Sequence, residues 1–143
     1  MTTKLDWDGD YTPLHDIDMS KEQSPEYLAL LLWSWDSLYQ WVTCPGSHLE
    51  GSIGESCTNG SCPLAQYLFY RTGIFWSVGP SIRPEYTRFK VIKPAWIQHL
   101  IEATDRSTGN KTGSISGKQF LTLLIVLKPE ADAWYAQASM EYK

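Results

Sequence analysis

The segment from Pro25 to Val42 is apolar on nearly all sides when it is read as a helix. Its start carries the expected signals, because the hydroxyl of Ser24 can cap the helix and proline suits the first helical position. Only a few interior positions are polar, namely Ser34, Asp36, Ser37 and Gln40. A helix of this kind lies at the centre of a domain or is shared with another chain, and we expect the first because a small domain needs a central helix.

The length of 143 residues predicts one globular domain, since a chain of this size buries roughly 68 to 70 % of its unfolded surface. The apolar fraction of 43 % is well above that of chains that stay unfolded. Residues 1–24 differ, because they carry six acids and no clear periodicity. We therefore expect an acidic extended arm over residues 1–24 and a single globular α+β domain over residues 25–143.

The rest of the chain changes between helical and strand-like patterns. A helix is expected to begin at Pro63 and to end at Gly73. Alternating apolar residues favour an antiparallel pair formed by 74–78 and 86–92, and polar composition predicts loops at 43–61 and 105–117. Further helices are predicted at 94–104, at 118–127 and from 129 onward. This order predicts an α+β fold that is mainly helical, with about four to five helices, one antiparallel β-hairpin and a long loop that contains cysteine and histidine.

All three cysteines and one of the three histidines fall between residues 44 and 62. Cys44, His48, Cys57 and Cys62 would offer three sulfurs and one imidazole, a ligand set that suits tetrahedral zinc. Loops of this length are typically functional or stapled, so one structural zinc is the cofactor that the sequence suggests. A closed shell of four protein ligands would leave no open position for catalysis.

Two other interpretations of the same window stay open. Free cysteine is among the most buried residue types, so Cys44 and Cys62 can equally be small core residues at helix ends. Cys62 also stands at a predicted helix N-terminus, where the dipole lowers a thiol pKa, and His48 could act as its base. A small thiol enzyme that uses Cys62 and His48 is therefore the alternative function.

Seven Trp and eight Tyr are more rings than a small core is expected to hold with their polar atoms satisfied. The surplus predicts an interface, and hence a protein partner or a second copy of the chain. Trp33 and Trp41 lie off the main stripe of the first helix, and Trp7 and Tyr11 lie in the arm. These four side chains are the predicted partner-binding residues, because Trp and Tyr dominate interface energetics.

A basic segment near the middle of the chain carries Arg83, Arg88, Lys90 and Lys93, interleaved with aromatic residues. Such a strand can bind single-stranded nucleic acid, but a solvated strand that uses charge to block edge pairing has the same pattern. The net charge of −4 argues against broad nucleic-acid binding, although residues 1–70 carry a net −8 and residues 71–143 a net +4. Nucleic acid is therefore the weaker alternative partner.

Missing motifs exclude several classes of function. The sequence contains no GxxxxGK[ST], GxGxxG or GxSxG pattern, so phosphate-binding loops and serine nucleophile elbows are not expected. It also lacks a long apolar run and the apolar segment of a signal peptide, so we expect a soluble, cytoplasmic protein without a membrane partner. The sequence predicts a non-enzymatic protein-interaction module whose long loop is held by zinc or by packing.

Overall fold

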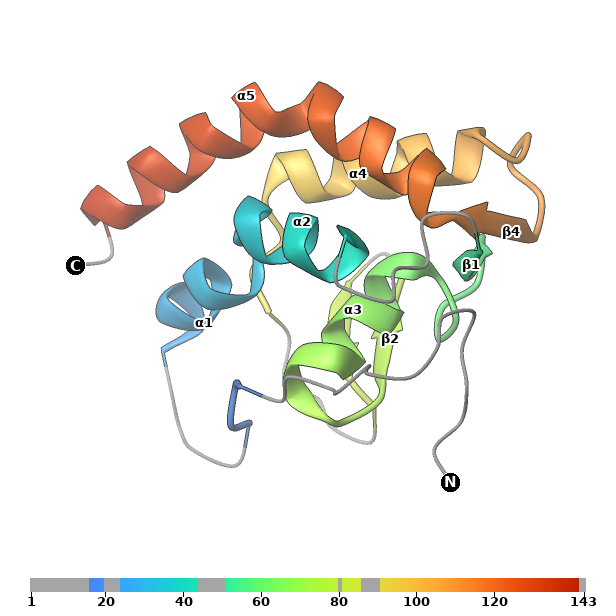
Figure 1. The fold of residues 1–143 in the computed structure, drawn as a ribbon. Helices are drawn as coiled ribbons and strands as arrows, with labels where there is room; N and C mark the ends of the chain where they lie inside the picture. The colour runs from blue at the N-terminus through green and yellow to red at the C-terminus, as the bar shows by residue number, and fades with distance from the viewer. Residues whose placement is uncertain (1–15, 20–23, 44–50, 80, 86–90, 142–143) are drawn as a thin grey trace.

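The computed structural model describes residues 16–19, 24–43, 51–79, 81–85 and 91–141. Within them the chain forms a mainly helical α+β fold with two small antiparallel sheets, which confirms the predicted fold class. In chain order the elements are α1 (Pro25–Leu32), α2 (Trp35–Thr43), β1 (Ser52–Ser56), α3 (Pro63–Thr72), β2 (Trp76–Val78), β3 (Ile82–Pro84), α4 (Ala95–Arg106), β4 (Gly113–Ser116) and α5 (Gly117–Glu141). Figure 1 shows α5 extending over α2 and α4, with α1 and α3 on the other side of α2.

The core is built around the aromatic residues of the predicted central segment. Trp41 meets Tyr67 of α3 and Phe120 of α5 edge-on, at ring-centroid distances of 5.8 and 5.9 Å. Trp33 and Trp96 are each 1 % exposed. Because these rings come from four different helices and the loop between α1 and α2, one shared apolar cluster holds the helices together.

The predicted helix from Pro25 to Val42 is interrupted at Trp33 and Ser34, so its continuity was predicted wrongly. The Ser34 hydroxyl accepts a hydrogen bond from the amide of Ser37 at 3.2 Å, and this begins α2 as a separate helix. The indole N–H of Trp33 donates to the carbonyl of Ile92 at 2.6 Å. The break therefore directs the Trp33 ring into the core.

Both predicted loops contain a strand, and the two strands pair with each other. β1 and β4 form an antiparallel ladder in which Glu55 faces Ser114 and Ser56 faces Gly113. The hydroxyl of Ser56 is fully buried and donates to the carbonyl of Lys111 at 2.9 Å. The long polar segments at 43–61 and 105–117 are thus held together over their described parts by backbone pairing.

The β-hairpin has a different second strand from the one predicted. β2 pairs with β3, with Trp76 opposite Pro84 and Val78 opposite Ile82. The predicted partner was 86–92, of which only residues 91 and 92 are described, and these lie outside any strand. The amide of Val91 still donates to the carbonyl of Ile82 at 3.1 Å, so the chain passes alongside β3.

The C-terminal part forms one helix, α5, although two helices were predicted on either side of Pro129. Proline removes the backbone donor that would pair with the carbonyl of Ile125. Since Ile125 and Pro129 are both exposed, water can reach that carbonyl and the helix continues. Among the described helices, none is both long and apolar enough to cross a membrane.

Part of the predicted arm contacts the domain. Ile17 is 4 % exposed, and its amide donates to the carbonyl of Arg71 at 3.1 Å. The carboxylate of Asp16 accepts two hydrogen bonds from the guanidinium of Arg71, at 2.6 and 2.8 Å. Residues 16 and 17 are therefore fixed against α3.

Candidate protein-binding surface

Of the four predicted zinc ligands, the structure describes Cys57 and Cys62 but not Cys44 and His48. Cys57 is exposed, and its amide donates to the carboxylate of Asp105 at 2.9 Å. Cys62 is buried at the N-terminus of α3. The structurally described part of the chain shows no cluster of three or more metal-ligating side chains. The four-ligand zinc site stays a prediction, because two of its members lie outside that part.

Cys62 caps α3, and its environment opposes thiolate formation. Its sulfur accepts a hydrogen bond from the amide of Ala65 at 3.4 Å. Burial raises the pKa of this thiol to about 11, although backbone hydrogen bonds from Ala65 and Leu64 act in the opposite direction. Cys62 is therefore protonated at neutral pH, which weighs against its use as a nucleophile.

Backbone hydrogen bonds hold the described end of the long loop. The amide of Glu55 donates to the carbonyl of Ser61 at 2.8 Å, and the amide of Val78 donates to the carbonyl of Asn59 at 2.8 Å. These bonds connect the loop to β1 and β2. The path of the chain from Glu55 to Ser61 is thus fixed in part by backbone hydrogen bonds.

Two of the predicted partner-binding residues are part of the core. Trp33 is 1 % exposed and Trp41 is 2 % exposed, so neither ring offers surface to a partner in this structure. Sequence periodicity placed both off the main stripe of one long helix, but the break at Ser34 turns α2 and brings both rings inside. Trp7 and Tyr11, the other two predicted contacts, lie outside the described residues.

The basic segment is described only at its two ends. Arg83 is exposed on β3, where a strand residue that alternates with buried Ile82 and Pro84 is expected to face solvent. Lys93 is half-buried before α4. Arg88 and Lys90 lie outside the described residues, so binding of nucleic acid by this segment stays a prediction.

The surface that the sequence analysis missed lies on α5. Its solvent side carries a row of six uncharged residues spaced by three and four, with Ile125 beside the row, and all seven residues are exposed. Val126 is 70 % exposed, Ile125 57 % and Met140 81 %. We call this surface the outer stripe, and its members are Thr122, Ile125, Val126, Pro129, Ala133, Ala136 and Met140.

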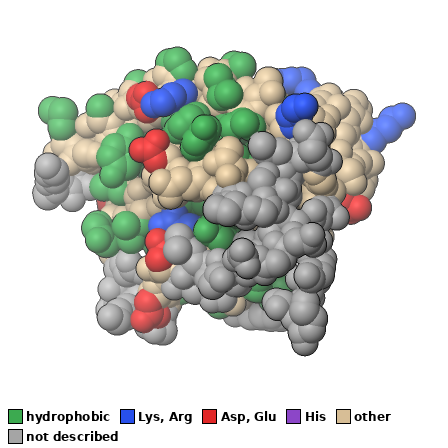
Figure 2. Space-filling view, viewed as in Figure 1, with side chains coloured by type: hydrophobic (Ala, Val, Ile, Leu, Met, Phe, Trp, Pro, Cys, Tyr) green, Lys and Arg blue, Asp and Glu red, His purple; other side chains and the backbone are tan. Residues whose placement is uncertain are grey.

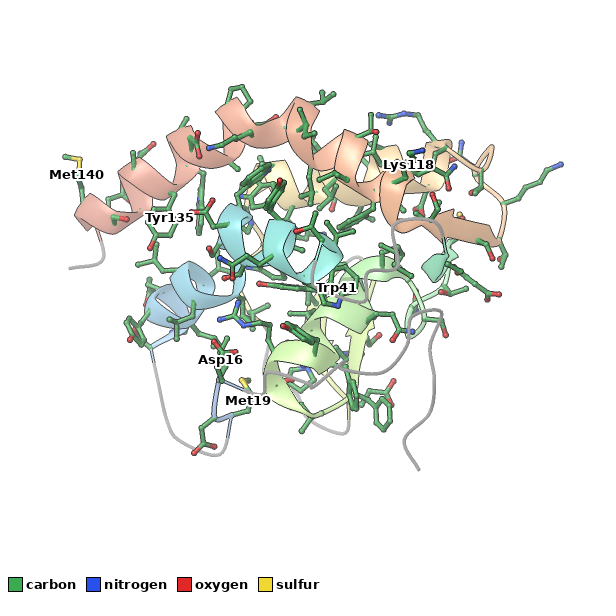
Figure 3. The ribbon with its side chains drawn as sticks, viewed as in Figure 1. Asp16, Met19, Trp41, Lys118, Tyr135 and Met140 are labelled. Atoms are coloured by element: carbon green, nitrogen blue, oxygen red, sulfur yellow. The ribbon has the colours of Figure 1, made fainter. Side chains whose placement is uncertain are left out.

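The figures show how the outer stripe lies relative to the domain. Hydrophobic side chains gather along the upper edge of the molecule, where α5 runs, with charged side chains beside them (Figure 2). Met140 points away from the domain at the end of α5, while Tyr135 lies on the side that faces α1 (Figure 3). The helix is thus apolar both toward the core and toward solvent.

A groove of about 320 Å³ adjoins the outer stripe where α5 passes the start of α2. Its aromatic walls are Trp35 and Tyr135, and its charged walls are Asp36, Lys128 and Asp132. The indole N–H of Trp35 donates to the carbonyl of Leu124 at 2.7 Å, and the Trp35 ring stacks on Tyr39 at 5.2 Å. These contacts fix the ring that forms one wall.

Spacing along 118–141 contained the signal for this surface, because two apolar stripes occur on opposite sides of the same helix. The prediction of two helices on either side of Pro129 concealed this pattern.

The chain matches no protein-family model, no curated protein and no solved structure in any of the three comparisons. The function must therefore be argued from the chain's own surface.

Proposed function

We propose that this protein is a non-enzymatic protein-interaction module, and that the outer stripe of α5 is the center of its binding surface. The observation that carries the proposal is the exposure of Ile125, Val126 and Met140 on the solvent side of a single helix. Solvent-facing helix positions are normally polar, and contiguous apolar surface marks interaction sites. The energetic reason is that covering these side chains removes apolar area from water.

The residues beside the stripe fit the same function. Tyr135 is 44 % exposed and borders the groove, so it can serve as an aromatic anchor at the edge of an apolar interface. Lys128 and Asp132 form an exposed i,i+4 ion pair at 2.9 Å and supply a polar rim. An apolar line with an aromatic and charged border is the composition expected of a surface that binds another protein.

The proposal is tested by adding a charge to the stripe without disturbing the fold. Val126→Lys places an ammonium group in the stripe at Val126, which is more exposed than Ile125. Ser114→Lys adds the same charge on β4 as a matched control. Each protein is used to capture partners from a lysate of its source cells, with quantitative mass spectrometry as the readout. We expect a defined set of proteins to be captured equally by the wild type and Ser114→Lys but about tenfold less by Val126→Lys, the loss that a hot spot produces.

Two results decide the outcome. Equal capture of every partner by the wild type and both variants would contradict the proposal. Sedimentation velocity on the same samples covers the case in which the partner is a second copy of the chain, since the wild type would then associate with increasing concentration and Val126→Lys would not. Thermal unfolding must show that the two variants are as stable as the wild type, as expected for exposed substitutions.

A further inference from the structure

The charges that line the groove do not balance. Asp36 and Asp132 contribute two carboxylates, and Lys128 contributes one ammonium group. The lining therefore carries a net charge of −1, and one further cation would neutralise it. The two aspartates come from α2 and α5, so the charge is a property of the groove rather than of one helix.

The chain's own lysine shows what kind of group the groove accepts. The ammonium nitrogen of Lys128 lies 4.9 Å from the centroid of the Trp35 ring and 2.9 Å from the carboxylate of Asp132. The hydrogen bond to Asp132 raises the pKa of Lys128, so the cation is the stable form. A cationic side chain on an aromatic face beside a carboxylate is thus already present at one end of the groove.

The other aromatic wall is available for the same kind of contact. Tyr135 is 44 % exposed, and the Asp36 side chain lies on the opposite helix of the groove. A planar guanidinium group can stack on an aromatic ring while its N–H groups donate to carboxylates in a fork, and it is less strongly hydrated than an ammonium group. An arginine therefore fits this wall better than a second lysine does.

We propose that the groove receives an arginine side chain of the partner protein. This inference rests on the proposed function, since the groove adjoins the outer stripe and shares Ala136 with it. The guanidinium lies between Tyr135 and the carboxylates of Asp36 and Asp132. An anionic group would meet two carboxylates, and an apolar group would remove those carboxylates from water without pairing them. Charge complementarity thus selects a cationic segment.

The probe for this proposal is a blocked Gly-Arg-Gly peptide, and its control is the same peptide with citrulline in place of arginine. Citrulline has nearly the same shape but no charge. The readout is the ¹H–¹⁵N resonance of the Trp35 indole, whose N–H is hydrogen-bonded within the groove wall. We expect the arginine peptide to shift this resonance in a saturable manner, and we expect no shift from the citrulline peptide.

Substitutions in the groove give opposite expected effects. Asp36→Asn and Asp132→Asn each remove one carboxylate and should weaken binding of the arginine peptide about threefold to tenfold. Lys128→Met removes the internal cation and should strengthen binding by a similar factor, because the competing charge is lost and the Trp35 face becomes free. A gain of affinity is not expected from damage to the fold, and the location of the shifts separates it from nonspecific attraction, which would not be confined to the groove.

Four results would overturn the proposal: no saturable shift with the arginine peptide, equal shifts with the citrulline peptide, no strengthening in Lys128→Met, or shifts spread over acidic residues on other faces such as Glu102. If the peptide fails to bind while Val126→Lys still loses its captured partners, only the arginine inference fails. If the stripe variant also behaves like the wild type, the proposed function fails with it.

Discussion

Arg71 is the one charged residue that is buried among the described residues, and its side chain is only 5 % exposed. Its guanidinium donates to both carboxylate oxygens of Asp16, to the Tyr67 hydroxyl at 2.7 Å and to the carbonyl of Leu31 at 3.2 Å. The Tyr67 hydroxyl donates in turn to the carbonyl of Leu32 at 2.7 Å. This network joins the residues before α1, the end of α1 and α3 at one point.

We predict that Asp16→Asn destabilises the protein by about 2–3 kcal/mol, because it leaves the buried guanidinium without a counter-charge. The loss should be smaller than for a fully buried pair, since the Asp16 side chain is 40 % exposed. Urea unfolding measures it. Asp132→Asn is the matched control, because it breaks an exposed pair and should change stability by about 0.5 kcal/mol or less. Equal losses in the two variants would contradict the account of Arg71.

The thiol of Cys62 predicts a pH dependence of stability. Its pKa is raised by burial from 9.0 to about 11 in the folded protein, so the unfolded chain releases this proton at lower pH than the native state. The stability that the protonated thiol contributes is present below pH 9 and is lost as the pH rises toward 11.

Cys62→Ser keeps a capping side chain at this position and removes the titration. We expect the wild type to lose about 1 kcal/mol more than Cys62→Ser between pH 8 and pH 10. Urea unfolding at the two pH values measures the difference, which is independent of the constant cost of the substitution. Parallel losses in the two proteins would show that the thiol is not desolvated.

Cys62 also shows what sequence can and cannot predict for a single residue. Its place before Pro63 predicted a helix N-terminus, and α3 begins there. The expected lowering of its pKa was wrong, because burial outweighs the helix terminus. Helix position follows from neighbours in the chain, whereas burial depends on distant segments that local sequence does not reveal.

At the scale of elements, local signals determined what could be predicted. α3 was predicted with its observed boundaries because Pro63 and Gly73 mark its two ends. The pairing of β1 with β4 was not predicted, since the strands are far apart in the chain and Ser52–Ser56 is not rich in β-forming residues. Ser34 was treated as an interior residue of one long helix, although its hydroxyl caps the start of α2.

Gly54 in β1 gives a prediction at this scale. A Cβ atom at this position would lie 2.6 Å from the backbone nitrogen of Pro63 and 2.7 Å from the carbonyl oxygen of Ser61. Since both of these atoms belong to the backbone, Gly54→Ala must displace the start of α3 or β1. We expect the free energy of unfolding to fall by about 2 kcal/mol or more. Thermal unfolding tests this expectation.

Gly60→Ala is the matched control, because an added Cβ at Gly60 meets nothing within 4 Å. It should leave the melting temperature nearly unchanged. If Gly54→Ala were as stable as Gly60→Ala, the close approach of β1 to α3 would not exist in solution.

At the scale of the whole molecule, the sequence predicted that surplus Trp and Tyr form an interface, and this stays a prediction. The exposed apolar surface that we propose as a binding site lies elsewhere. Trp33 and Trp41, the expected contacts, complete the core. The exposed apolar side chains of the outer stripe lie instead on α5, whose inner side packs on α2 and α4. Sequence alone could not separate the two sides of this helix, because both are apolar and only tertiary packing determines which one is covered.

The proposed function requires that the outer stripe of α5 is in contact with another protein in the cell. The most direct measurement is site-specific photo-crosslinking in the source cells, with a photoreactive amino acid placed at Val126, at Met140 and, as a control, at Ser114 on β4. We predict a discrete crosslinked species, containing this chain and a second protein, from positions 126 and 140 and none from position 114. The absence of crosslinks at both stripe positions, or the same products from all three positions, would contradict the claim.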